Sequence, residues 1–74
     1  MKTAKEMFEE LGFDIGKIHS REDVVGYHNY GKMSVYFHKN KSVGAHSNGN
    51  YAIINIELLQ AINKQAEELG WLDE

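Results

Sequence analysis

Three side chains able to bind metal ions or move protons fall on consecutive segments of strand type: His28, Ser34 and His46. If three-residue turns join these segments, His28 faces Ser34 and Ser34 faces His46, which sets the two imidazoles about 9–10 Å apart. They could share a metal ion only by leaning over Ser34, and no carboxylate on these segments completes a ligand set. We therefore expect no metal site, and a slip of one residue in the pairing would scatter the three side chains.

The remaining polar residues form no recognisable catalytic arrangement. No serine stands in a Gly-x-Ser-x-Gly pattern, and the glycines lack the spacing of a phosphate-binding loop. Acidic residues occur as adjacent pairs, which on exposed helix ends are usually just solvated. We expect a protein that is not an enzyme and that needs no cofactor.

Aromatic and polar side chains should share a sheet face that no helix covers. The alternation in residues 32–38 puts Ser34, Tyr36 and His38 on one face, and Tyr30 or Tyr51 joins them, depending on register. An exposed β surface rich in tyrosine often marks a protein contact. We expect a homodimer through this face, with an ordinary solvated face as the alternative. The candidate partner-binding residues are His28, Tyr30, Ser34, Tyr36, His38 and His46.

A small basic group at a hairpin tip gives a second hypothesis, in which the protein binds nucleic acid or a nucleotide weakly. Its candidate residues are Lys39 and Lys41, joined by Lys32 and His38. Binding through so few charges would be weak and sensitive to salt. The alternative is that these lysines keep edge strands from pairing with other chains.

Two helices should flank the strands. The segment 55–71 has Asn55 as a candidate N-cap, Gly70 as a stop and Trp71 folding back on the last turn. Its apolar positions recur at spacings of three and four: Leu59, Ile62, Ala66 and Leu69, with Leu58 beside them. The N-terminal segment repeats the pattern, with a capping box at Thr3 and Glu6 and a stop at Gly12 followed by Phe13.

Both helices carry glutamate pairs in their last turn, 9–10 and 67–68, where the helix dipole disfavours each by about 0.3–1 kcal/mol. We expect Lys17, Arg21 or the hairpin lysines to offset these charges. The alternative is an acidic patch that a partner recognises.

The fold we expect is α+β, of the type α-β(3-4)-α, in which both helices pack on one face of an antiparallel meander. Helices are predicted near 3–11 and 56–69, and strands near 24–30, 32–38 and 43–46. An extended stretch at 13–19, a turn at Asn48-Gly49 and a last strand at 51–54 are further expectations. The expected core is Met7, Phe8, Leu11, Val25, Tyr27, Val35, Phe37, Val43, Leu59, Ile62, Ala66 and Leu69.

Length and composition favour one domain spanning residues 1–74. The chain has no cysteine, which fits a reducing compartment, and no long apolar run or apolar leader, so we expect a cytoplasmic protein without a membrane span. A formal net charge of −3 offers no general attraction to nucleic acid.

Two stretches resemble a known family. TAKEMFEELGF at 3–13 and ELLQAINKQAEELGWL at 57–72 resemble the two ends of very small uncharacterised proteins encoded by phages and prophages of Gram-positive bacteria. The resemblance covers about a third of the chain, and the middle is richer in glycine and histidine than the family pattern. It implies an origin, a bacterial host cytoplasm and a helix-meander-helix fold, and it supplies no catalytic or binding residues. Together these observations predict an accessory protein that acts by binding a host or phage protein.

Overall fold

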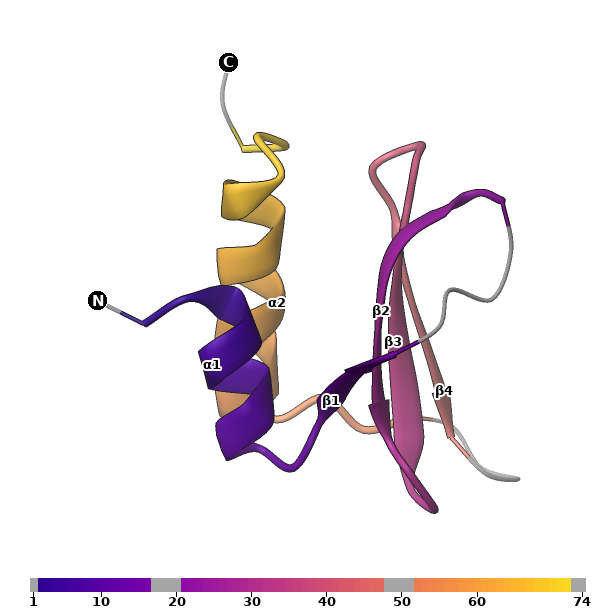
Figure 1. The fold of residues 1–74 in the computed structure, drawn as a ribbon, viewed down its shortest axis with the longest axis vertical. Coiled ribbons are helices and arrows are strands. Elements are labelled where there is room, and N and C mark those ends of the chain that lie inside the picture. The colour runs from indigo at the N-terminus through magenta and orange to yellow at the C-terminus, as the bar shows by residue number, and fades with distance from the viewer. Residues whose placement is uncertain (1, 17–20, 48–51, 73–74) are drawn as a thin grey trace.

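The computed structural model describes residues 2–16, 21–47 and 52–72. One helix from each end of the chain lies on the same side of a four-stranded antiparallel sheet (Figure 1). This confirms the expected α-β(3-4)-α fold, with four strands. The elements in chain order are α1 (Ala4–Glu10), β1 (Asp14–Gly16), β2 (Asp23–Asn29), β3 (Met33–His38), β4 (Val43–Ser47) and α2 (Ile56–Glu68).

The segments that flank the central strands match the expectations in part. β1 lies within the extended stretch expected at 13–19, of which residues 17–19 are outside the described residues. The prediction of a last strand at 51–54 is wrong for residues 52–54, which form no strand. These residues cross from the sheet to the N-cap of α2 (Figure 1). Tyr51 and the Asn48-Gly49 turn lie outside the described residues.

Both helix starts use the expected caps. The Thr3 side chain accepts from the backbone N–H of Glu6, whose carboxylate in turn accepts from the Thr3 backbone N–H at 2.9 Å. The hydrogen bonds that the Glu6 carboxylate accepts from the backbone N–H and from the hydroxyl of Thr3 hold the pKa of Glu6 below its ordinary value. In α2 the Asn55 side chain accepts from the Leu58 backbone N–H at 2.9 Å. No helix in the described part of the chain is long and apolar enough to cross a membrane.

The two helices also end alike. Gly12 and Gly70 adopt φ values of 91° and 78°, a left-handed conformation that suits glycine. The next residue then returns to the helix, because the Phe13 backbone N–H donates to Phe8 at 2.9 Å and that of Trp71 donates to Ala66 at 3.0 Å. The shared sequence pattern therefore reflects shared stop chemistry.

The helices run in opposite directions (Figure 1), and the start of α1 is joined to the last turn of α2 by a hydrogen bond. The backbone N–H of Ala4 donates to Glu68 Oε2 at 2.7 Å. A carboxylate that its own helix dipole disfavours is thus placed at the positive end of the neighbouring helix.

Lysines offset the other terminal acids, but they are not the lysines expected from sequence. Lys2 binds Glu10 at 2.7 Å, and Lys64 binds Glu67 at 3.2 Å. Both lysines belong to the helical segments. Among the described residues, Arg21, Lys39 and Lys41 form no ion pair with these glutamates, and Lys17, which was also expected to offset them, lies outside the described residues. The helix layer therefore neutralises much of its own charge.

The core lies between the helices and the inner face of the sheet. Phe8 of α1 stacks on Tyr27 of β2 with ring centroids 3.8 Å apart and an interplanar angle of 9°. The Tyr27 hydroxyl donates to Gln65 Oε1 of α2 at 2.5 Å, which satisfies two buried polar groups at once. The fully enclosed cluster is Phe8, Phe13, Tyr27, Val35, Phe37, Leu58 and Ala61.

Two residues that were expected in the core are exposed, so these two predictions are wrong. Leu59 is 51% exposed because the buried side of α2 is centred on Leu58 and Ala61, which puts Leu59 on the flank of the helix. Val43 is 38% exposed because it begins the edge strand β4. Of the other expected members, Ala66 is buried, and Met7, Leu11, Val25, Ile62 and Leu69 are partly buried against the cluster.

Candidate functional site

The strand register across the sheet is the one expected from sequence. Asp14, His28, Ser34 and His46 lie opposite one another in a row across the four strands. The next row along the outer face, which no helix covers, is Gly16, Gly26, Tyr36 and Gly44. A tight turn at each end of β3 sets this register, with positive φ at Gly31 and at Lys41.

Imidazole rings lie over the glycines of this face. A Cβ atom added at Gly16 would overlap His28 Cδ2, and one added at Gly44 would lie 3.1 Å from His38 Nε2. His28 Nδ1 is also 3.0 Å from Ser34 Oγ, at hydrogen-bond distance. The glycines thus make room for rings that pack flat on the sheet.

Tyr36 lies beneath this ring layer, and its expected exposure is wrong. It is 9% exposed, and its ring makes edge contacts with His28 and His46 at centroid distances of 5.4 and 5.8 Å. Its neighbours in the glycine row have no side chains to lift it from the sheet. Tyr30, by contrast, is 76% exposed and stacks on His28 with ring centroids 5.6 Å apart, so it is the accessible tyrosine among the described residues of this face.

His38 has a different partner from the other two histidines. Its Nδ1 lies 2.5 Å from Oδ1 of Asp23, a carboxylate whose side chain is only 1% exposed. A bulge between Asp23 and Val25 brings the carboxylate under the ring. Among residues 2–16, 21–47 and 52–72 there is no group of three or more His, Asp or Glu side chains that could hold a metal ion.

The candidate anion contacts do not come together as expected. Lys32 lies in the β2–β3 turn and Lys39 and Lys41 in the β3–β4 turn, at opposite ends of β3. The chain at Arg21 instead lies close to the β3–β4 turn. The Lys39 backbone N–H donates to the Glu22 carbonyl at 2.6 Å, and this bond extends the pairing of the two strands beyond the start of β2. The sequence signal for Arg21 was its place two residues before a strand that pairs with β3.

Lys32 belongs to a small hollow at the other end of the sheet. This hollow of about 250 Å³ brings Lys32 together with Tyr30, Ser34 and His46, and no carboxylate is among its described lining residues. The outer face therefore has two parts. One is the ring layer, in which His28 and His46 pack on Tyr36, and the other is the open corner, which is the small hollow beside Tyr30 and Lys32.

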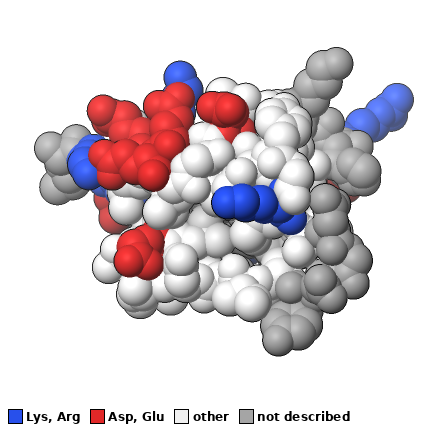
Figure 2. All heavy atoms as spheres, turned by 90° about the horizontal axis from the view of Figure 1, so that it is seen from below, with Lys and Arg blue, Asp and Glu red and all other residues white. Residues whose placement is uncertain are grey.

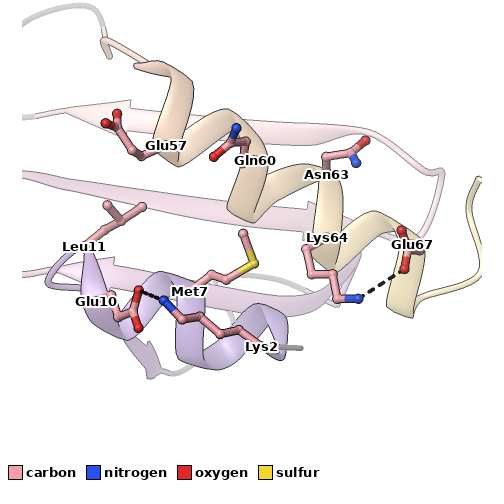
Figure 3. A pocket seen from close by; sticks show the side chains of 9 residues that line it. All are labelled: Lys2, Met7, Glu10, Leu11, Glu57, Gln60, Asn63, Lys64 and Glu67. Carbon is pink, nitrogen blue, oxygen red and sulfur yellow. Dashed lines mark hydrogen bonds and ion pairs between the residues drawn. The ribbon is translucent and has the colours of Figure 1, made fainter.

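A larger hollow, which sequence reasoning missed, lies between the two helices (Figure 3). It has a volume of about 600 Å³. Met7 and Leu11 of the N-terminal segment supply its apolar floor, and both also pack against the core. The sequence signal for it was a row of polar residues at spacings of three and four on α2. The groove is lined by Lys2, Met7, Glu10, Leu11, Glu57, Gln60, Asn63, Lys64 and Glu67.

Charge on the rim of this groove is unevenly paired. Glu10 and Glu67 each hold a lysine of their own helical segment, and dashed contacts mark both pairs in Figure 3. Glu57 forms no ion pair with any described residue. Figure 2, which views the molecule from below, shows acidic side chains gathered on the helix side. The groove thus combines an apolar floor with a rim of three glutamates and two lysines, in which Glu57 is the glutamate without a lysine partner among the described residues.

Comparisons of the chain with protein-family models, curated proteins and solved structures found no match. The site must therefore be interpreted from its own geometry. Polar groups of the outer sheet face pair with their neighbours, as His28 does with Ser34. The groove between the helices and the small hollow beside Lys32 are open to an external ligand.

Proposed function

We propose that the chain is a small accessory protein of phage or prophage origin that works by binding another protein in the bacterial cytoplasm, and not by catalysis. The resemblance of its two end segments supports the origin. The single observation that carries the binding role is the groove between α1 and α2, which offers an apolar floor outside the closed core.

The groove fits one amphipathic helical segment of a partner. A helix laid in such a groove buries apolar side chains spaced by three and four along it. Met7 and Leu11 provide the matching apolar contacts, and the flexible thioether of Met7 adapts to different side chains. The ring layer on the outer sheet face offers less, because Tyr36 is already covered.

The charges around the groove favour a basic partner. Both lysines of the rim are held by Glu10 and Glu67, so they are already paired when a partner's acidic groups approach. Glu57 stands at the first turn of α2 and is exposed. Lys or Arg residues on the polar side of the partner helix would pair with Glu57.

Capture from a host lysate with groove variants tests this proposal. Glu57→Lys combined with Gln60→Lys changes exposed groove residues without touching the core. Asp14→Lys is the matched control, because it reverses one exposed charge on β1, away from the groove. We expect the parent and the control to retain one common partner that the groove variant loses.

The captured partner must then bind where the proposal says. A peptide carrying its basic amphipathic segment should shift the NMR signals of Met7 and Leu11 in the parent. A partner retained equally by all three proteins, or a peptide that leaves both signals unmoved, contradicts the groove as the binding site.

The open corner of the outer face supports a second candidate, weak binding of a nucleotide or of nucleic acid. Exposed Tyr30 could stack on a base while Lys32, Ser34 and His46 contact phosphate. The hairpin tip, with Arg21, offers a separate cationic contact. NMR titration with a mononucleotide at two salt concentrations distinguishes these sites, and signals that stay unmoved in low salt at both the corner and residues 39–42 exclude the candidate.

A further inference from the structure

The outer edge of β4 carries backbone hydrogen-bonding groups that pair with no other strand in the described part of the chain. β4 pairs with β3 alone among the described residues. The His38 backbone N–H donates to the Ser42 carbonyl at 2.9 Å. Because hydrogen-bonded pairs alternate along an antiparallel ladder, the backbone N–H and C=O groups of Gly44 and His46 also point toward β3. The N–H and C=O groups of Val43, Ala45 and Ser47 consequently point away from the sheet.

This edge lacks the features that usually prevent strands of two molecules from pairing. Natural edge strands are protected by charged side chains, proline, bulges or short length. Residues 43–47 include no Lys, Arg, Asp or Glu and no proline, and the register between β3 and β4 is regular. The opposite edge differs, since β1 has three residues and begins with the charged Asp14.

The sequence of β4 is complementary to itself. In an antiparallel pair of two copies centred on Ala45, each Ala45 faces Ala45 of the other copy, and Val43 faces Ser47. Gly44 then faces His46, which gives each imidazole a neighbouring glycine, as His28 has at Gly16 within one copy. This arrangement juxtaposes no like charges, and it forms about six backbone hydrogen bonds.

Exposed apolar side chains lie along the same edge. Val43 pairs with Phe37, so it belongs to the inner, helix-covered face of the sheet, yet it is 38% exposed. Leu59 lies on the flank of α2 opposite the groove, because residues 57 and 59 are about 200° apart around a helix. Since α1 contacts β1, this flank of α2 lies toward β4, and a second sheet beside β4 would cover Leu59.

We propose that a second copy of the chain pairs its β4 with this edge, and that the two sheets join into one of eight strands. The two-fold axis passes by Ala45. The interface is small, so the dimer is weak and depends on concentration. The proposal does not rest on the helix groove, and it moves the homodimer expected from sequence from the sheet face to the sheet edge.

Sedimentation velocity over a wide concentration range tests the pairing. We expect reversible dimers of the parent at high concentration. Val43→Pro should abolish them, because proline removes an outward N–H and no bond to β3 at this position. Intrinsic fluorescence of Trp71, which lies 6.0 Å from Phe37 between ring centroids, reports whether the variant is folded. A parent that stays monomeric throughout, or a folded Val43→Pro variant that dimerises like the parent, overturns the proposal.

Cross-linking gives a second test that does not depend on a destabilising change. The chain has no cysteine, so Ala45→Cys introduces one thiol at the two-fold axis. Directly opposed residues of a hydrogen-bonded pair have Cα atoms about 5.5 Å apart, within disulfide range. Oxidised glutathione should link this variant into dimers but not the control Ile15→Cys, which is 50% exposed on the other edge. Equal cross-linking of the two variants contradicts the β4 contact.

The groove as a partner site and the β4 edge as a dimer contact can be tested independently of each other. Glu57→Lys with Gln60→Lys should leave sedimentation unchanged, because both side chains lie in the groove. Val43→Pro should leave peptide binding in the groove unchanged. A loss of both properties in either variant would show that the β4 edge and the groove are not separate surfaces, and it would overturn the edge contact as we describe it.

Discussion

The buried phenol of Tyr27 should make the stability of this protein fall in alkaline solution. The Tyr27 side chain is 1% exposed, is stacked on Phe8 and donates its proton to Gln65 Oε1. Burial raises the pKa of Tyr27 to about 12, and the negative charges of Glu68 and Glu9 act in the same direction. Ionisation of this group is therefore resisted only in the folded state.

The sign and size of the effect follow from that difference. In the unfolded chain the phenol loses its proton near its ordinary pKa of 10.0, so between pH 10 and 12 the folded state binds more protons than the unfolded state. The stabilisation is complete below pH 10 and is lost as the pH rises toward 12. The gap between the two pKa values corresponds to roughly 2–3 kcal/mol of unfolding free energy.

Urea unfolding at a series of alkaline pH values, followed by Trp71 fluorescence, measures this loss. Tyr27→Phe should cost about 1–3 kcal/mol at neutral pH, because Gln65 loses its buried donor. The same variant should lose less additional stability than the parent between pH 10 and 12. Tyr30→Phe, a change at an exposed tyrosine, should behave like the parent. If the Tyr27→Phe curve runs parallel to that of the parent over this range, the assignment of the alkaline loss to Tyr27 is refuted.

Three further predictions concern the stability of the sheet. Gly16→Ala should lower the urea midpoint by the equivalent of about 1–3 kcal/mol, because the new Cβ displaces the His28 ring. His28→Ala in the same chain should recover most of that loss, and strictly additive effects would contradict the contact. Lys41→Gly should raise the melting temperature, because φ is 67° at this residue and left-handed backbone costs a residue with a side chain about 1–2 kcal/mol. His38→Ala should cost about 1–3 kcal/mol in chemical unfolding at neutral pH, since the buried Asp23 carboxylate loses its imidazole contact. Adding Asp23→Asn should restore part of the loss, and an unchanged midpoint in His38→Ala would exclude the contact as a source of stability.

The strand register could be predicted because two local signals agree. Alternation in β3 fixes which side chains share a face, and the three-residue turn with Lys41 in left-handed geometry fixes the offset to β4. Together these signals place His28, Ser34 and His46 in one row across three strands. The helix boundaries could be predicted for a similar reason, since caps and glycine stops act within a few residues.

The burial of individual side chains could not be predicted in the same way. Alternation assigns Tyr36 to the outer face, but its burial depends on imidazoles packing over neighbouring glycines. Leu59 and Val43 have core spacing, yet their exposure depends on which part of the sheet α2 covers. The helix groove likewise depends on the distance between two helices that come from opposite ends of the chain. Each of these features is set by tertiary packing and not by a local pattern.

The hydrogen bond from Ala4 to Glu68 joins residues 64 positions apart. With seven residues, α1 is shorter than the roughly 12–15 residues that an isolated helix needs in water. During synthesis α1 emerges before α2, and so before the Glu68 carboxylate that caps it. The N-terminal helix should therefore form only when α2 docks, so that spectroscopic probes placed at the two ends of the chain report a single cooperative transition.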